Sequence, residues 1–119
     1  MSRTITAEQI HQMRLKCTTD GERIVAYLWY LGDWTPTHAL MAVESPFGWI
    51  GSAGHVRARE LARGECAERL KGKVERARGG EIGLDPRFEY FRYAPQPKFT
   101  TADNAAAIKF FDDYPVHSS

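Results

Sequence analysis

Basic side chains are concentrated in one stretch of this 119-residue chain. Residues 52–78 hold eight Lys or Arg against four Glu, whereas the remainder holds eight against eleven acids. The formal net charge of +1 therefore hides a local excess of positive charge. Guanidinium groups gathered on one face bind polyanions, because each presents a fixed charge and a planar set of donors. The stretch predicts a surface for a phosphate-rich polymer, and the alternative is an ordinary solvated face.

The segment SAGHVRARELAR, residues 52–63, predicts a helix that carries three of these arginines and that Ser52 caps. With about 100° between successive residues, small and apolar side chains share an inner arc: Gly54, His55, Ala58, Leu61 and Ala62. The opposite arc holds Val56, Arg59, Glu60 and Arg63, with Arg57 at its edge. The small inner arc lets the helix lie close to a neighbour, which leaves the outer arc for a ligand.

Two short strands are predicted after this helix, at 73–78 and 87–93, because both segments are rich in residues that favour strands. The eight residues between them include three glycines and are too many for a tight hairpin. Side chains alternate along a strand. The first strand therefore has two faces, one with Arg76 and Arg78 and the other with Lys73 and Glu75.

Two helices are predicted ahead of the basic region. The sequences Thr6-Ala7-Glu8-Gln9 and Thr19-Asp20-Gly21-Glu22 are capping boxes. They open helices over residues 7–17 and from residue 20 to Leu31. The second helix is apolar on most sides, so Trp29 must be covered by the N-terminal helix, the C-terminal tail or a second subunit.

A shorter helix is predicted over residues 36–44, because Thr35 supplies a cap and Pro36 suits the first helical position. The sequence Ser45-Pro46-Phe47-Gly48 ends it. The following turn is expected to fill the core with Phe47, Trp49 and Ile50.

Residues 20–95 resemble the small winged helix-turn-helix domains of bacteria and their phages. The resemblance rests on the order TDGERIVAYL, GDWTPTHALM, SAGHVRARELAR, KVERARGG and FEYFRYAP. It implies an α+β, mainly helical fold, with a winged helix-turn-helix at 19–97 between an N-terminal helical extension at 1–18 and a C-terminal helical tail at 98–119. The chain departs from the pattern at the long turn 45–51 and at the segment GECAERLKG ahead of the wing.

Domains of this family most often bind double-stranded DNA, and the resemblance implies that helix 52–63 reads the major groove. Ser52 and the backbone N–H groups at the helix start are expected to meet a phosphate. Arg59 and Arg63 are expected at base edges, where a guanidinium fork matches the two acceptors of guanine. Val56 is expected at a thymine methyl group, and Arg57 at the phosphate backbone.

A second set of DNA contacts is expected outside that helix. Thr37 is a phosphate candidate, because the first helix of this motif crosses the backbone. In the wing, residues 73–93, the side chains of Lys73, Arg76 and Arg78 are expected to hold phosphates or to enter a minor groove. The resulting hypothesis is a sequence-specific transcriptional regulator that works as a homodimer.

An alternative is a protein-interaction module on the same scaffold, encoded by a phage to act on a host protein. Its candidate interface residues are Trp29, Phe99, Phe110 and Phe111, because exposed aromatic clusters often mark interfaces. The last two fall in a helix predicted over 102–113. The competing explanation is that these side chains pack on the domain or build the homodimer.

The sequence predicts no enzyme, metal site or cofactor. The four histidines are scattered without metal-binding spacing, and no glycine-rich phosphate loop is present. No apolar run reaches the roughly 20 residues of a membrane span, and the N-terminus lacks the apolar core of a signal peptide. Cys17 and Cys66 match no metal spacing, so free thiols and a cytoplasmic location are expected.

Overall fold

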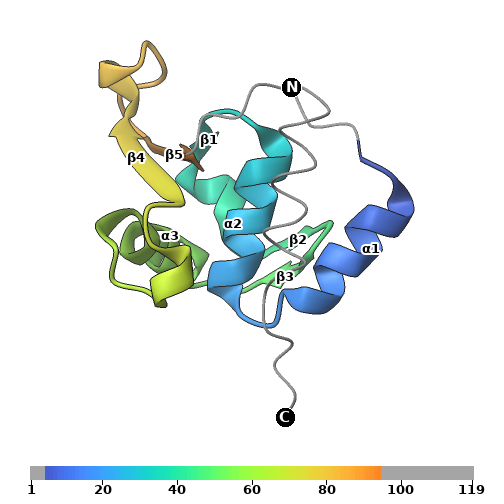
Figure 1. Ribbon diagram of the computed structural model, residues 1–119. Coiled ribbons are helices and arrows are strands. Elements are labelled where there is room, and N and C mark those ends of the chain that lie inside the picture. Colours follow the sequence, from blue (N-terminus) through green and yellow to red (C-terminus); the bar gives the residue numbers. More distant parts are fainter. Residues whose placement is uncertain (1–4, 95–119) are drawn as a thin grey trace.

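The computed structural model describes residues 5–94, which form an α+β fold of three α-helices and two antiparallel sheets (Figure 1). The helices are α1 (Ala7–Lys16), α2 (Asp20–Leu31) and α3 (Gly54–Arg63). The strands are β1 (Thr35–Pro36), β2 (Val43–Ser45), β3 (Gly48–Ile50), β4 (Val74–Arg78) and β5 (Glu89–Tyr93). Short 3-10 helices lie in the connections: η1 (Thr37–Leu40), η2 (Glu68–Leu70) and η3 (Gly79–Glu81). The α+β class is confirmed, and the helix predicted over 102–113 lies outside the described residues.

The first two helices begin where their capping boxes predict. Thr6 Oγ1 accepts the Gln9 N–H at 3.1 Å, and the Gln9 side chain accepts the Thr6 N–H at 3.0 Å. Thr19 and Glu22 make the same reciprocal pair at the start of α2. Gly32 ends α2 in the left-handed conformation, with φ 71°. These boundaries are confirmed because the signals that set them are local.

The core surrounds α2, whose Ile24, Val25, Leu28 and Trp29 are fully buried. Met13 of α1 lies in the same cluster, so the N-terminal helix packs on the domain. The expectation that Trp29 offers an interaction surface is therefore wrong. An indole on a helix that is apolar on most sides is covered within the chain itself.

The prediction of a helix over residues 36–44 is wrong. Thr35 and Pro36 instead form β1, which pairs antiparallel with β5 through the partners Phe91 and Tyr90. Only η1 is helical, and Ala42 has a left-handed φ of 50°, which interrupts any helix. Pairing with a distant strand outweighs the local Thr-Pro signal, and Pro36 is tolerated because β1 is an edge strand.

The predicted turn at 45–51 is a β2–β3 hairpin. Ser45 Oγ closes it by accepting the Phe47 N–H at 3.1 Å and donating to the Gly48 carbonyl at 2.8 Å. Phe47 and Ile50 are fully buried, as expected, but Trp49 is 54% exposed. The prediction for Trp49 is wrong because alternation along β3 turns it away from the core face that Ile50 occupies.

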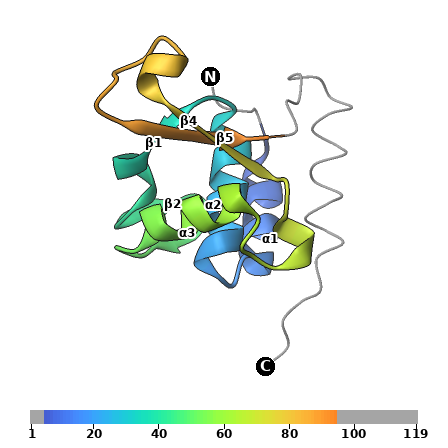
Figure 2. The ribbon, with the colours of Figure 1, turned by 90° about the vertical axis from the view of Figure 1, so that its left-hand side faces the viewer.

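The predicted β4–β5 hairpin is confirmed. The larger sheet has the order β1-β5-β4, and β4 and β5 pair with Arg78 opposite Glu89 and Arg76 opposite Phe91 (Figure 2). The connection folds back on itself at Gly79. A Cβ atom there would lie 1.8 Å from the Asp85 carbonyl oxygen, so only glycine permits this approach.

Close packing against the end of η1, just before the β2–β3 hairpin, sets the position of α3. A Cβ atom on Gly54 would lie 1.8 Å from the Leu40 carbonyl oxygen, so the first turn of α3 rests directly on the end of η1. Ser52 does not cap this helix. The N-cap is Ala53, one residue later than predicted, and it makes no side-chain hydrogen bond.

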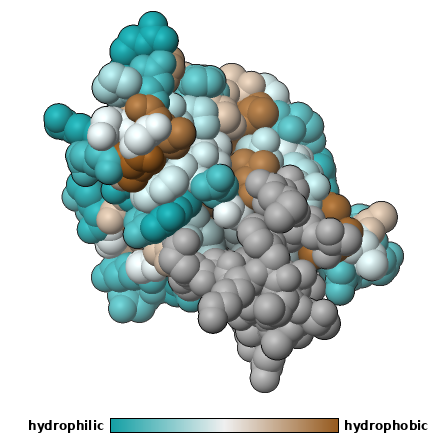
Figure 3. Space-filling model, turned by 90° about the horizontal axis from the view of Figure 1, so that it is seen from above, coloured by the Kyte–Doolittle hydropathy of each residue, from teal (hydrophilic) through white to brown (hydrophobic). Residues whose placement is uncertain are grey.

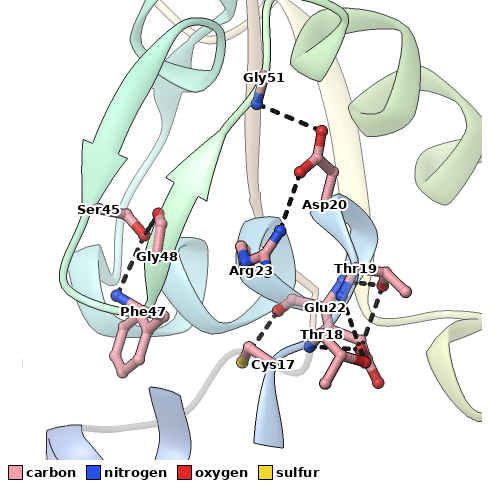
Figure 4. Close-up of polar contacts among 10 residues, drawn as sticks. All are labelled: Cys17, Thr18, Thr19, Asp20, Glu22, Arg23, Ser45, Phe47, Gly48 and Gly51. Carbon is pink, nitrogen blue, oxygen red and sulfur yellow. Dashed lines mark hydrogen bonds and ion pairs between the residues drawn. The ribbon is translucent and has the colours of Figure 1, made fainter. Parts of the chain in front are cut away.

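A buried carboxylate, that of Glu22, joins three segments (Figure 4). One oxygen accepts the backbone N–H groups of Thr18 and Thr19 at 3.0 and 3.1 Å, and the other accepts Nη2 of Arg69 at 2.8 Å. Burial alone would raise the pKa of Glu22, but the hydrogen bonds from Thr18, Arg69 and Thr19 outweigh it and lower the pKa. The turn between α1 and α2 is thereby fixed to η2.

Substitution of Gly54 by alanine should destabilise the protein by about 3 kcal/mol, because the new methyl group forces α3 away from Leu40. Gly21→Ala is the matched control. Its Cβ would meet only ordinary contacts, the nearest being a Leu70 methyl carbon at 3.5 Å. Urea unfolding of both variants checks this, and equal stabilities would contradict the packing.

Glu22→Gln should cost about 3 kcal/mol at neutral pH, because it leaves the Arg69 guanidinium without its buried anion. The folded-state pKa of Glu22 is depressed, so its contribution is complete above the ordinary value of 4.5. It is lost as the pH falls through the folded-state pKa. Urea unfolding as a function of pH should show the two proteins converging in acid, whereas a pH-independent difference would contradict the ionised pair.

Candidate nucleic-acid interface

Helix α3 and the β4–β5 hairpin lie on the same side of the molecule (Figures 1 and 2). Helix α3 packs against β4, which carries Arg76 and Arg78. Two groups of predicted site residues that are separate in the sequence, at 57–63 and 76–78, are therefore brought together. They form one surface with a helix below and a hairpin above in the view of Figure 2.

Glu89 of β5 is the centre of this surface. Its Oε1 accepts Nε and Nη2 of Arg59 at 3.2 and 2.8 Å, its Oε2 pairs with Arg76, and its carbonyl oxygen accepts the Thr37 hydroxyl at 3.1 Å. Burial alone would raise the pKa of Glu89, but the guanidinium groups of Arg59 and Arg76 outweigh it and lower the pKa. Two of the predicted site residues thus converge on one carboxylate, and a third, Thr37, is bonded to the backbone of the same residue.

The remaining predicted residues of the helix region lie at the surface. Ser52 is exposed, and Val56 is 39% exposed. Arg57 pairs with Glu60, and Arg63 pairs with Glu65 at 3.0 Å. Exposed ion pairs of this kind contribute little to stability, because solvent screens them. These two guanidinium groups can exchange a local carboxylate for another anion at little cost.

The far end of the hairpin holds further arginines. Arg76, Arg78, Arg87, Phe88 and Glu89 line an open hollow of about 280 Å³, the wing hollow. Arg87 pairs with Asp85 at 2.7 Å and lies over the Phe88 ring at 5.5 Å. At this end of the molecule, brown atoms gather at the left of Figure 3, and Leu84 and Phe88 are exposed. The hollow combines cationic groups with an apolar wall.

Lys73 is half-buried just ahead of β4, and its carbonyl oxygen accepts the Ala94 N–H at 2.8 Å. It therefore lies at the opposite end of β4 from Arg78. The structure does not bring Lys73 into the wing hollow, whose lining comes from the other end of the hairpin.

Sequence reasoning missed Glu89 and Arg87. A signal for Glu89 was available: when the strands predicted at 73–78 and 87–93 are paired, an acid faces the arginines of the first strand. The contact with Arg59 had no such signal, because it joins residues 30 positions apart. Of the candidate protein-interface residues, Trp29 is buried, whereas Phe99, Phe110 and Phe111 lie outside the described residues.

Both cysteines are free in the structure, as expected. Cys17 is buried, and burial raises the pKa of its thiol to about 12. Within residues 5–94, no three His, Cys, Asp or Glu side chains gather closely enough to hold a metal ion. In the same range, no helix has the length and apolar character needed to cross a membrane.

Comparison with protein-family models, curated proteins and solved structures found no match for this chain. Its function must therefore be inferred from its own residues and their geometry.

Replacing Glu89 by glutamine should lower the free energy of unfolding by about 1–3 kcal/mol, because Arg59 and Arg76 lose a shared, half-buried anion. Glu81→Gln is the matched control, since Glu81 is an exposed acid on the same hairpin. Thermal and urea unfolding of both variants measure the effect. Equal loss in the two would show that Glu89 does not hold the hairpin to α3.

Proposed function

We propose that this chain binds double-stranded DNA, with the outer face of α3 in the major groove and the β4–β5 hairpin on the neighbouring backbone or minor groove. One observation carries the proposal: the Arg59–Glu89–Arg76 cluster joins α3 to the β4–β5 hairpin. Both elements carry exposed arginines, Arg57 and Arg63 on α3 and Arg78 on β4. The proposed role is that of a sequence-specific regulator acting as a homodimer.

The order of the elements supports a winged helix-turn-helix. Helix α2 is followed by η1, then α3, then the β4–β5 hairpin, and in this motif two helices and a two-stranded wing have the same order. The short η1 stands where the first helix of the motif is expected, and the β2–β3 hairpin occupies the turn. Gly54 seats α3 against the end of η1, which keeps the two elements in contact.

The dimensions and exposure of α3 suit a groove. Its ten residues make a helix about 15 Å long, and the major groove of B-DNA, about 12 Å wide, admits a helix. Arg57 and Arg63 are exposed on it and suit guanine or phosphate. Arg59 is held by Glu89, so we assign it to fixing the hairpin and not to reading a base.

Selection from random-sequence duplex DNA at two salt concentrations tests the proposal. Enrichment of a palindromic motif, with affinity that falls steeply with salt, is the expected result, because bound arginines release counterions from phosphates. If the protein retains DNA without enriching any motif, its binding is nonspecific and not sequence-specific. No retention at low salt would overturn DNA binding and direct attention to a protein partner.

Arg78→Ala should weaken binding to every duplex by a similar factor, because Arg78 is an exposed wing residue suited to phosphate. The slope of log affinity against log salt should become shallower by about 1. Arg14→Ala is the control, since Arg14 lies on α1, away from the β4–β5 hairpin, and pairs with Glu44 of β2. Fluorescence anisotropy with a labelled duplex measures both, and equal effects would contradict the assignment of the wing.

A further inference from the structure

Residues of α1, the start of α2 and the β2–β3 hairpin line a second hollow. These elements lie away from the β4–β5 hairpin (Figure 1), and Figure 4 shows Asp20, Arg23 and Gly48 of the lining. Its volume is about 500 Å³, and its lining includes Arg14, Asp20, Arg23, Phe47, Gly48 and Trp49. Small-molecule sites typically measure about 300–1,000 Å³. We call it the Trp49 pocket.

Arg23 is fixed in this pocket with much of its hydrogen-bonding capacity unused. A Cβ atom on Gly48 would lie 2.8 Å from Arg23 Nε, so the guanidinium rests on the glycine backbone. That Nε is buried without a hydrogen-bond partner, and Nη1 makes one long ion pair, at 3.3 Å, with Asp20. The guanidinium therefore meets Asp20 through one nitrogen, and its remaining Nη hydrogens can be donated to a second carboxylate.

Two further residues complete the chemistry of the pocket. Arg14 reaches in from α1 and is anchored by Glu44 at 3.0 Å and by the Pro46 carbonyl oxygen at 3.4 Å. Trp49, which the core does not use, is 54% exposed and offers a flat apolar ring. Two guanidinium groups beside an exposed indole match a ligand with a small negative charge and a planar body.

We propose that the Trp49 pocket binds a small aromatic carboxylate, with its carboxylate toward Arg23 and Arg14 and its ring against Trp49. Asp20 lies in the lining, and its negative charge repels a phosphate dianion more than a monoanionic carboxylate. Cys17 also lines the pocket. The site is independent of DNA binding, because none of the proposed DNA contacts lines it.

Titration of the ¹⁵N-labelled protein with benzoate, followed by NMR, tests this assignment. Benzoate should produce saturable shifts of the Gly48 and Gly51 amides and of the Trp49 indole N–H. Benzamide, which has the same ring without the charge, should produce none of them. Arg23→Gln should weaken benzoate binding at least about tenfold, the effect of losing one charge-assisted hydrogen bond.

Arg92→Gln is the matched control, because Arg92 lies over the ring of another tryptophan, Trp34, at 4.1 Å. Benzoate should bind this variant as it binds the wild type. Trp49→Ala removes the ring from an exposed position and should also weaken binding if Arg23→Gln fails to fold. Absence of a saturable shift, equal shifts with benzamide, or tighter binding of inorganic phosphate would each overturn the proposal.

Discussion

The buried Glu22 carboxylate is the constraint on which the arrangement of this domain depends. An ion without solvent contact is strongly destabilising unless its oxygens are satisfied. Here the satisfying groups come from Thr18 and Thr19 before α2 and from Arg69 in η2. Because η2 lies between α3 and β4, the same carboxylate that starts α2 also fixes the connection from the third helix to the hairpin.

Glu89 is a second carboxylate that joins separate elements, in this case at the surface. Its carboxylate links Arg59 of α3 to Arg76 of β4, and its carbonyl oxygen takes the Thr37 hydroxyl. Glu22 thus fixes η2 in the connection that follows α3, whereas Glu89 joins the hairpin to α3 itself. A surface built in this way keeps its arginines in place before any ligand arrives, which reduces the entropy lost on binding.

The sequence predicts the elements whose signals are local. Capping boxes locate α1 and α2, and richness in strand-favouring residues locates β4 and β5. The failures lie where a distant partner decides the outcome. Thr35 and Pro36 join β5 because Phe91 and Tyr90 offer backbone partners there, and no local pattern records that pairing. Likewise, the periodicity of residues 52–63 placed Arg59 on the outer arc, but only the fold reveals Glu89 beside it.

Acids among the arginines shape the kind of binding that the proposed interface favours. Glu60 and Glu65 neutralise Arg57 and Arg63 in the free protein and would repel phosphates close to α3. Contact between α3 and the DNA backbone alone would therefore contribute little binding free energy. Under the proposed function, a base edge must match the guanidinium fork to replace the carboxylate with which each arginine already pairs. Under the proposed function, the mixed charge of α3 would thus favour sequence-dependent contact, and Arg78 on the β4–β5 hairpin would supply attraction that any duplex shares.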